Sequence, residues 1–405
     1  MQCTDGYLKA IAGHDSSPKS WYFGLDGIRA IAVLLVFSIH YAKEQTLTVG
    51  WTGVMIFFVL SGFLITGLLY DNRNEPHRFR NFYIRRTLRI FPLFYFTWLL
   101  VLLAGLYLHA KWHGIQILWL TYLGNYVRFF VGSLAQDHIY TQNPNFILEI
   151  GHFWSLAVEE QFYLIWPLVV FFVRKRETLI RICIATVVLV PVLRTILFYA
   201  LPEKLLALEF LYRMTFTQCD GFLLGGLMAL YLRSPAKDLL LSNAKKILCI
   251  PSVLLVLAYL LNNGLHLREL SGTSQWMSTY GFTIVDFMAA GLILCTLQRG
   301  TMIYRVMTLR PLQMLGRYSY GFYVYHVLLA PFLNFYVWPI NGYATPYFHY
   351  IHFGLVKIIH FFIIFAVSLC SYHLIELPFL RMKDLFTLRH RNPGAPNAEQ
   401  SGLPA

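Results

Sequence analysis

Apolar stretches long enough to cross a membrane recur along the whole chain, separated by short segments that hold most of the charged residues. A helix of about 20 apolar residues crosses the hydrocarbon core of a bilayer, because each residue advances it by about 1.5 Å. The pattern therefore predicts an all-α polytopic membrane protein with about ten transmembrane helices in one domain, residues 21–380. The expected spans cover residues 24–42, 51–70, 90–109, 152–173, 178–199, 209–232, 246–262, 279–298, 316–338 and 352–378.

Lysine and arginine gather in alternate connections between these spans, and this distribution predicts the orientation of the chain. Because cytoplasmic loops carry an excess of both residues, we expect the basic connections and both termini in the cytoplasm. Residues 115–131 are apolar enough for a further span, but that crossing would place the basic residues 174–176 outside, so we expect a re-entrant or interfacial segment there. Residues 1–20 form a polar N-terminal segment, and residues 381–405 a basic, disordered cytoplasmic tail.

The composition agrees with a membrane protein and changes how the charge is interpreted. Hydrophobic residues make up 57% of the chain and charged residues 13%, against about 25% charged in soluble domains. The net charge of +13 would otherwise suggest a nucleic-acid partner. The basic connections explain it, because they face anionic lipid at the cytoplasmic surface of the membrane. We therefore expect membrane lipid as a partner, and no nucleic acid.

The first predicted span contains three residues that membrane insertion does not need, namely Asp26, Arg29 and His40. A charged side chain in the middle of a membrane helix costs about 2.5–3.5 kcal/mol on insertion scales, so a helix that only spans would avoid it. The spacing between Arg29 and His40 is close to three turns, which places them on one helix face about 16 Å apart. Histidine titrates near neutral pH, so the pattern indicates a functional site with His40 as the candidate base.

Small residues occupy the middle of the second predicted span, at Ser61 and Gly62. Small residues let helices approach closely, so helix packing explains each glycine taken alone. In the middle of the membrane, Ser61 and Gly62 could also bend the helix or open a backbone path for a ligand. Both interpretations stay open on the sequence alone.

An arginine-rich stretch leads into the third predicted span and ends with Arg85, Arg86 and Arg89. A cytoplasmic anchor needs lysine or arginine without preference, yet the stretch from position 73 to 89 contains six arginines and no lysine. Arginine holds a phosphate group through two parallel hydrogen bonds, whereas lysine acts as a point charge. The stretch is therefore either a topological anchor or a site for a phosphorylated ligand in the cytoplasm.

The fourth predicted span opens at its outer end with His152, Ser155, Glu159 and Glu160. Ser155 and Glu159 are four residues apart and so share one helix face. The helix dipole favours an acidic residue near a helix N-terminus, which explains one of these residues but not a histidine with two acids. We expect His40 at a similar depth, where Glu159 could orient or charge its imidazole ring.

Further polar residues lie in the later spans. Asp220 is a charge within an apolar segment, and Arg213, almost two turns earlier, is a candidate partner. Asp286 lies in the eighth span with no basic residue nearby in sequence. The ninth span contains Tyr325 and His326, and we interpret His326 as a histidine that packs within the bundle. No spacing of cysteines and histidines indicates a metal, and no glycine-rich loop followed by lysine indicates a nucleotide hydrolase.

Taken in order along residues 22–380, these segments resemble the membrane acyltransferase-3 family, which includes bacterial O-acetyltransferases of surface polysaccharides and acyltransferases of macrolides. The matching strings are LDGIRA, with ten residues between its arginine and the next histidine, GVMIFFVLSGFLI, FYIRRTLRIFP, HFWSLAVEEQFYL, the Arg213–Asp220 segment, GRYSYGFYVYH and IELP. The family's functional R-x10-H pair, RxxR motif and WSLxxE string correspond here to Arg29, His40, Arg86, Arg89, Ser155 and Glu159.

The resemblance implies an O-acyltransferase of the cell inner (plasma) membrane that uses cytoplasmic acyl-CoA, usually acetyl-CoA, and needs no metal. The arginines would hold the donor phosphates, and the pantetheine arm would pass among the helices beside Gly53 and Gly62. His40 would act as general base on a sugar hydroxyl of a carbohydrate or glycolipid acceptor, or as a transient acyl carrier. Residues expected to bind the acceptor or support the catalytic groups are Asp26, His152, Ser155, Arg213, Asp220, Tyr325 and His326.

Two other classes of function remain open on the residues alone. In a proton-coupled secondary transporter of a polar or glycolipid substrate, His40, Glu159, Asp220 and Asp286 would form a proton relay. Such transporters are commonly built from inverted repeats, and we find no convincing repeat in the sequence. A flippase of polyprenyl lipids, or a structural membrane partner, is the third class.

Overall fold

The computed structural model describes residues 24–41, 49–127, 129, 138–142, 147–263, 275–334 and 346–386. Its α-helices are α2 (Leu25–Tyr41), α3 (Thr52–Asp71), α4 (Arg78–Tyr107), α5 (Ile117–Leu120), α7 (Trp154–Phe172), α8 (Arg176–Ala200), α9 (Lys204–Arg213), α10 (Thr215–Tyr231), α11 (Lys237–Ser242), α12 (Ala244–Asn263), α13 (Phe282–Thr296), α14 (Met302–Met307), α15 (Arg310–Arg317), α16 (Ser319–Leu328), α17 (Ala330–Phe332), α18 (Pro346–Ser371) and α19 (Leu377–Phe386). Shorter 3-10 and π-helical turns are η2 (Gly114–Gln116), η3 (Gly124–Tyr126), η5 (Gly151–Phe153), η7 (Met277–Gly281) and η9 (Tyr372–Glu376), and the strands are β1 (His138–Tyr140) and β2 (Ile147–Glu149).

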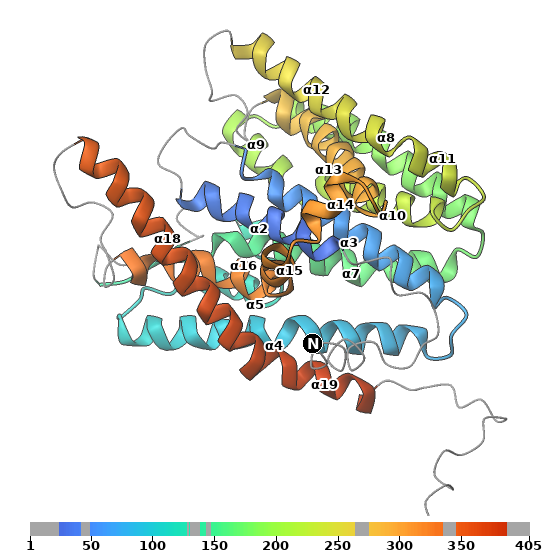
Figure 1. The fold of residues 1–405 in the computed structure, drawn as a ribbon. Helices are drawn as coiled ribbons and strands as arrows, with labels where there is room; N and C mark the ends of the chain where they lie inside the picture. Colours follow the sequence, from blue (N-terminus) through green and yellow to red (C-terminus); the bar gives the residue numbers. More distant parts are fainter. Residues whose placement is uncertain are drawn as a thin grey trace, which may run out of the picture.

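Long apolar helices dominate the described part of the chain and run between two ends of the molecule (Figure 1). Six helical segments there are long and apolar enough to cross a membrane. They are Thr52–Asp71, Arg78–Tyr107, Gly151–Phe172, Arg176–Ala200, Met277–Thr296 and Leu355–Lys383. Each overlaps a span expected from the sequence. The chain is therefore an α-helical membrane protein.

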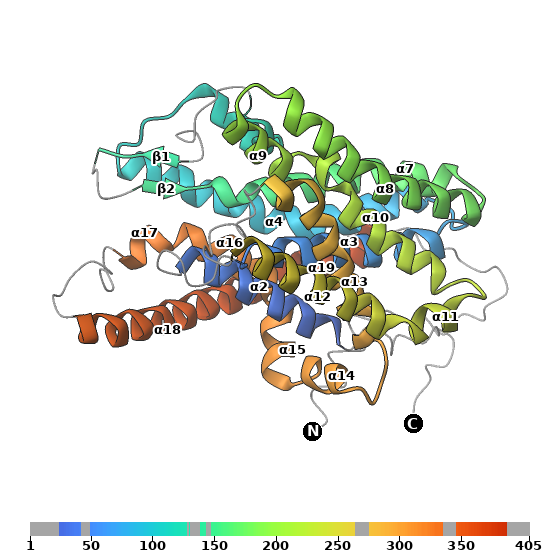
Figure 2. The same ribbon diagram turned by 90° about the horizontal axis from the view of Figure 1, so that it is seen from above.

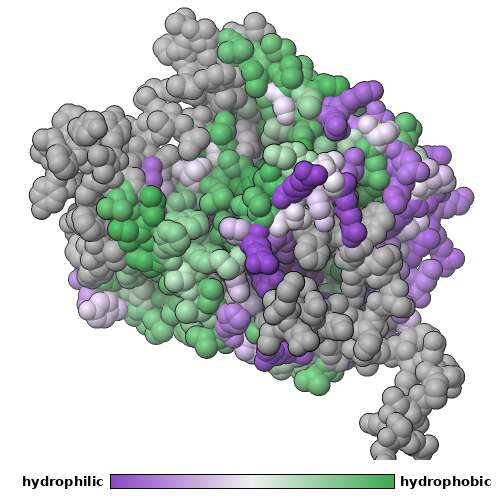
Figure 3. All heavy atoms as spheres, viewed as in Figure 1, coloured by the Kyte–Doolittle hydropathy of each residue, from purple (hydrophilic) through white to green (hydrophobic). Residues whose placement is uncertain are grey.

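The outer helices present apolar side chains on the surface of the molecule. Leu103 and Leu106 of α4 are 52% and 62% exposed, and Leu189 of α8 is 61% exposed. A surface of this kind is stable against lipid tails but not against water. Figure 3 shows apolar residues over much of the visible face and hydrophilic residues gathered toward the right of the view.

At the centre of the bundle, α3 packs closely on α10 and α2. A Cβ atom added to Gly62 would lie 1.8 Å from the carbonyl oxygen of Phe222, and one added to Gly53 would lie 2.3 Å from that of Ala32. Only glycine permits such an approach of two backbones. Neighbouring helices therefore fill the space beside Gly53 and Gly62, where the sequence suggested a path for a ligand.

Three connections that carry basic residues meet at one end of the molecule. Arg233, which follows α10, pairs with Asp71 at the end of α3 at an Nη2–Oδ2 distance of 2.5 Å. Arg176, at the start of α8, donates a hydrogen bond of 2.8 Å to the Arg233 carbonyl oxygen. The connections after α3, α7 and α10 thus lie on one side of the bundle, as their alternation along the chain predicted (Figure 1).

Two predicted spans are interrupted in the structure. The segment 209–232 divides into α9 and α10 at Met214, whose backbone is extended, with φ −81° and ψ 139°. The segment 316–338 is divided at Tyr318 and Leu329 among α15, α16 and α17. Its residues beyond 334 lie outside the described residues.

The segments around the bundle differ in part from the all-α expectation. The described residues of 115–131 form short helical turns and no membrane-spanning helix. A small antiparallel hairpin, in which His138 is opposite Glu149, was not predicted and packs near α16 (Figure 2). At the other end of the chain, α19 continues to Phe386, into the segment expected as a disordered tail. Residues 1–20 and 387–405 lie outside the described residues.

Candidate active site

Helix α2 carries Asp26 and Arg29 at its start and His40 in its last turn. Arg29 Nη1 lies 2.5 Å from Asp26 Oδ1, an ion pair within one helical turn. The rise of the helix separates Arg29 from His40 by about 16 Å. The two residues therefore belong to different polar groups of the molecule.

The first polar group surrounds His40 and includes His326 of α16. His40 Nδ1 lies 2.8 Å from the Val36 carbonyl oxygen and 3.3 Å from His326 Nε2. His326 is fully buried, and its Nδ1 lies 2.6 Å from the carbonyl oxygen of Tyr323. The two rings meet edge to face, with centroids 4.8 Å apart. His326 thus packs within the bundle, as the sequence suggested, and is also a direct neighbour of the candidate base.

His152 of η5 and Ser155, in the first turn of α7, reach the same place. The ring centroid of His152 lies 5.5 Å from that of His326. The hydroxyl groups of Ser155 and Tyr323 hydrogen-bond to each other, and the Tyr323 hydroxyl also lies 3.0 Å from the His152 carbonyl oxygen. We call His40, His152 and His326 the histidine cluster. Through His326, the histidine cluster brings polar residues of the first and fourth predicted spans close together.

Glu159 lies apart from the histidine cluster in its hydrogen bonding. Its Oε1 accepts hydrogen bonds from the Ser61 hydroxyl of α3 and from the Tyr163 hydroxyl. Among the described residues, the expected contact between Glu159 and His40 is not made. The reason is that α7 runs inward from Ser155, so Glu159 lies about one turn, or about 5 Å, further along the helix.

The second polar group lies on α4 and contains Arg85, Arg86 and Arg89, which we call the arginine cluster. The Arg86 guanidinium lies over the ring of Tyr163, 4.2 Å from its centroid. Within the part of the chain that the structure describes, none of the three arginines forms a hydrogen bond or an ion pair. Their donors therefore remain available for an anion, and guanidinium groups bind phosphate oxygens in a bidentate geometry.

Arg89 connects the arginine cluster to the other helices. Its electrostatic neighbours include Arg29 of α2, Arg86 and Glu376 of η9. Its side chain is accessible to solvent although protein atoms surround it densely. Helix α4 begins at Arg78, well before the span predicted from residue 90, so these arginines lie on a rigid helix rather than in a loop.

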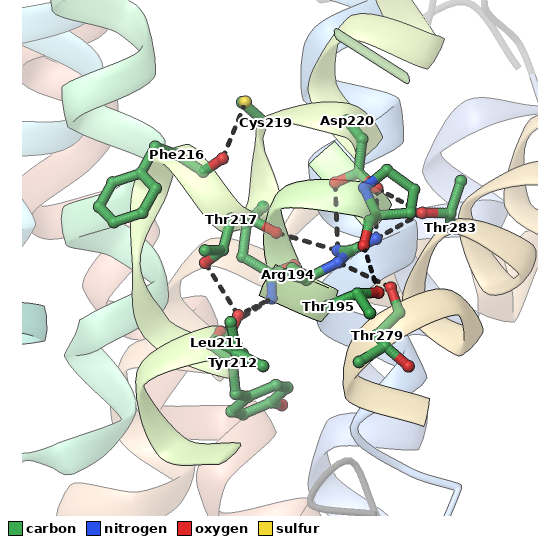
Figure 4. Close-up of polar contacts among 12 residues, drawn as sticks. Arg194, Thr195, Leu211, Tyr212, Phe216, Thr217, Cys219, Asp220, Thr279 and Thr283 are labelled. Atoms are coloured by element: carbon green, nitrogen blue, oxygen red, sulfur yellow. Dashed lines mark hydrogen bonds and ion pairs between the residues drawn. The ribbon is translucent and has the colours of Figure 1, made fainter. Parts of the chain in front are cut away.

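A third polar group is buried between α8, α10 and α13 (Figure 4). Arg194 Nη2 lies 2.7 Å from Asp220 Oδ2, and both side chains are fully buried. Arg194 also donates 3.0 Å and 2.9 Å hydrogen bonds to the carbonyl oxygens of Thr279 and Thr217. The Thr283 hydroxyl donates to Asp220 Oδ2 at 2.6 Å. Asp220 therefore has a complete set of partners within the bundle.

The expected pair of Arg213 and Asp220 is wrong. Arg213 Nε lies 3.1 Å from Glu209 Oε2, one turn earlier on α9. The extended backbone at Met214 separates α9 from α10, so the spacing of one continuous helix does not apply. Arg194, the actual partner, lies in the second half of the predicted span 178–199, and a charge at that position in an apolar segment is the feature of the sequence that could have indicated it.

Two further polar residues of the predicted spans, Tyr325 and Asp286, lie outside the three groups of contacts described above. The Tyr325 hydroxyl donates a 3.0 Å hydrogen bond to Ser371 Oγ and so joins α16 to α18. Asp286 lies beside the Arg194–Asp220 pair, and its Oδ1 is buried without a hydrogen-bond partner in the described part of the chain. Among the described residues, no group of three or more His, Cys, Asp or Glu side chains could hold a metal ion.

The family of this chain follows from its sequence as a whole. A family model described as an acyltransferase domain matches residues 22–375, which include the histidine cluster, the arginine cluster and the buried Arg194–Asp220 pair. Because the match covers most of the chain, the protein belongs to this acyltransferase-3 family.

Curated relatives are similar over most of this chain. The O-acetyltransferase OatA of Staphylococcus aureus (strain NCTC 8325 / PS 47) is 28% identical over 367 residues, which are 88% of this chain and 56% of that protein. SACOL0978 of strain COL, which bears the provisional name of an O-acetyltransferase, is 28% identical over 375 residues, 88% of this chain and 57% of the relative. The chain thus spans about half the length of the curated relatives it matches. No solved structure matches.

Proposed function

We propose that the protein is an O-acetyltransferase of the plasma membrane. It would move an acetyl group from cytoplasmic acetyl-CoA to a sugar hydroxyl in a surface or exported glycan. Membership of the acyltransferase family supports acyl transfer, and the names of the relatives support an acetyl group and an oxygen acceptor. The observation that carries the proposal is that α2 links the two clusters, with Arg29 beside the arginine cluster and His40 in the histidine cluster.

The arginine cluster is suited to the donor. Arg86 and Arg89 are three residues apart on one face of α4 and have unused donors, so they would bind the phosphates of CoA. The Tyr163 ring supports Arg86, and Glu159 holds the Tyr163 hydroxyl. We therefore assign Glu159 to positioning on the donor side. The flexible arm of the donor would bridge the distance of about 16 Å along α2 to His40.

His40 is suited to the chemistry, because one nitrogen of its ring is held by the protein and the other is not. In direct transfer, His40 Nε2 takes the proton of the acceptor hydroxyl while the hydroxyl oxygen bonds to the thioester carbonyl carbon. The carbon–sulfur bond then breaks, and the CoA thiolate takes the proton from the imidazolium. In a two-step variant His40 carries the acyl group itself, and ping-pong kinetics would distinguish this route.

The same proposal includes the arrangement in the membrane. We propose ten spans with both termini in the cytoplasm, because the basic connections after α3, α7 and α10 lie on one side of the bundle. The arginine cluster, near the start of α4, then faces the compartment that contains acyl-CoA. A reporter fused to the C-terminus that is active only outside the cytoplasm would contradict this count.

Replacement of His40 by alanine tests the function. Loss of a general base lowers the rate by about 10²–10⁴-fold, and loss of a covalent carrier abolishes it. Purified protein in detergent is assayed for release of CoA thiol from acetyl-CoA and for transfer of labelled acetyl groups to an acceptor glycan. The variant should still insert into the membrane and bind acetyl-CoA. Transfer at the parental rate by the His40→Ala variant would remove His40 from the mechanism.

A further inference from the structure

The histidine cluster contains a second residue for which the proposed chemistry has a use. We propose that His326 is a positioning residue for His40: it holds His40 in the tautomer whose Nε2 is unprotonated, and it shares the positive charge that His40 gains during transfer. This inference rests on the proposed function, in which His40 is the base.

The tautomers follow from the backbone groups that the two rings contact. A carbonyl oxygen can only accept a hydrogen bond, so a ring nitrogen at hydrogen-bond distance from it must carry the proton. His326 Nδ1 lies 2.6 Å from the Tyr323 carbonyl oxygen, and His40 Nδ1 lies 2.8 Å from that of Val36. In the neutral state both rings are therefore protonated at Nδ1, and both Nε2 atoms have a free lone pair.

This assignment makes the contact between the rings directional. His326 Nε2 lies 3.3 Å from His40 Nδ1, so the lone pair of His326 faces the N–H group of His40. The His40 N–H is then shared between Val36 and His326, and it cannot move to the other nitrogen without losing both acceptors. His40 Nε2 is left as the free base, on a side chain that is exposed to solvent.

His326 is held firmly enough to orient its neighbour. It is fully buried, and its ring lies against those of His152 and Tyr323, with centroid distances of 5.5 Å and 5.4 Å. The Tyr41 hydroxyl donates a 2.8 Å hydrogen bond to the His326 carbonyl oxygen. Because Tyr41 follows His40 directly, two neighbouring contacts join helices α2 and α16 at this place.

The pair can also move charge without an anion. When His40 Nε2 accepts the proton of the acceptor hydroxyl, the ring becomes an imidazolium with a proton on each nitrogen. The Nδ1 proton is then shared with His326 Nε2, which spreads the positive charge over two rings, and it returns when the thiolate takes the Nε2 proton. A carboxylate could orient His40 in the same way, but an unpaired carboxylate in a buried site carries a large desolvation penalty. The neutral ring of His326 avoids it.

Two substitutions separate positioning from packing. His326→Gln keeps a carbonyl oxygen that can accept from His40 Nδ1–H, whereas His326→Leu fills the space with no acceptor. We expect the Leu variant to lower kcat for acetyl transfer by about 10–100-fold with an unchanged KM for acetyl-CoA. The Gln variant should recover most of that loss. The matched control is His360→Leu, since His360 is equally buried but has no hydrogen-bond partner among the described residues, and it should transfer at the parental rate.

A double variant tests whether His326 acts through His40. In a His40→Ala background, His326→Leu should cause no further loss of transfer. Equal losses for His326→Leu and His326→Gln, or transfer within about twofold of the parent by His326→Leu, would overturn the positioning role. The failure of the proposed function is a different result, because it requires normal transfer by His40→Ala alone.

A measurement on the unmodified protein does not depend on how the variants fold. Ring nitrogen-15 NMR of histidine-labelled protein distinguishes the two neutral tautomers. We expect both His40 and His326 to be protonated at Nδ1, the form that is less common in water. A His326 ring protonated at Nε2 could not accept from His40, and this result alone would contradict the proposal.

Discussion

Arginine occupies two contrasting environments in this protein. Arg194 is fully buried. Its guanidinium donates hydrogen bonds to the Asp220 carboxylate and to the carbonyl oxygens of Thr217 and Thr279. Arg86 and Arg89 lie on α4 with no hydrogen bond or ion pair among the described residues. The hydrogen-bond donors of arginine are thus used by protein partners in one region and left unused by the protein in the other.

The difference separates a structural site from a binding site. A buried charge is tolerated only when partners satisfy its hydrogen bonds, so the surroundings of Arg194 are complete and leave no capacity for a ligand. The N–H groups of Arg86 and Arg89 donate to solvent water instead of to protein groups. An incoming phosphate can therefore replace this water at little cost in free energy. This comparison predicts opposite outcomes when each arginine is removed.

The largest effect is expected for Arg194→Met. The substitution leaves Asp220 as a buried charge without its partner, which destabilises a folded protein by about 3–5 kcal/mol. The melting temperature in detergent and the yield of folded protein should both fall. Addition of Asp220→Leu should restore part of the stability, because the unpaired carboxylate is removed. If Arg194→Met melts at the parental temperature but binds acetyl-CoA more weakly, Arg194 would be a binding residue and not a structural one.

An intermediate effect is expected for Arg86→Ala and Arg89→Ala, and it should concern binding rather than stability. Each lost hydrogen bond to a phosphate is worth about 1.5–3 kcal/mol, so the Kd for acetyl-CoA should rise by about 10–150-fold with an unchanged melting temperature. Lysine should rescue only in part, because the forked geometry is lost. In detergent, titration calorimetry measures the Kd for acetyl-CoA and scanning calorimetry measures the melting temperature.

The control for these variants is Arg80→Ala, an exposed arginine nearer the start of the same helix. It should bind acetyl-CoA as the parent does. If Arg86→Ala and Arg89→Ala also bind acetyl-CoA as tightly as the parent, the arginine cluster serves only as a topological anchor, and the contrast with Arg194 loses its functional meaning.

A smaller effect is expected when the support of Arg86 is removed. Tyr163→Leu deletes the ring beneath the guanidinium, an interaction worth about 0.5–2 kcal/mol, and should weaken acetyl-CoA binding by about 2–30-fold. Tyr163→Phe keeps the ring and loses only the hydroxyl that binds Glu159, so its Kd should stay near that of the parent. Equal weakening by both variants would assign the effect to the hydroxyl instead.

The smallest effect is expected for substitution of Asp286. This substitution tests whether Asp286 contributes to the buried network of Arg194 and Asp220. Asp220 accepts from Arg194 and Thr283, whereas Asp286 has no hydrogen bond among the described residues. Asp286→Asn should therefore change the free energy of unfolding by less than about 1 kcal/mol, while Asp220→Asn should cost more, since it weakens a charged hydrogen bond. Melting temperatures that fall equally would show that Asp286 belongs to the network.

Much of the fold was predictable because each membrane-spanning helix corresponds to a continuous apolar stretch of the sequence. The segments that became α2, α3, α7 and α13 match expected spans within a few residues. The breaks at Met214 and Tyr318 were not predictable in this way, since hydropathy continues across them while the backbone direction changes. The hairpin of β1 and β2 was missed because its strands are too short to show an alternating pattern.

The candidate site was predictable by residue type but not by partner. The sequence located His40, His152 and Ser155 in one region. In the structure His40 and His152 both lie against His326, and Ser155 hydrogen-bonds to Tyr323. The sequence assigned Glu159 to His40, whereas in the structure Glu159 accepts hydrogen bonds from Ser61 of α3 and from Tyr163 of α7. Helical spacing gives distances along one helix, and it contains no information on which neighbouring helix faces a given side chain.

The sequence by itself therefore determined the class of protein, the positions of its apolar helices and the separation of Arg29 from His40 along one helix. These properties depend on the thickness of the hydrocarbon core and on the rise of the α-helix, which act locally. Only the tertiary structure decided that His326 meets His40, from 286 positions away in the chain, and that Arg194 rather than Arg213 pairs with Asp220. Such pairs depend on close backbone contacts such as that at Gly62, which set how the helices lie against one another.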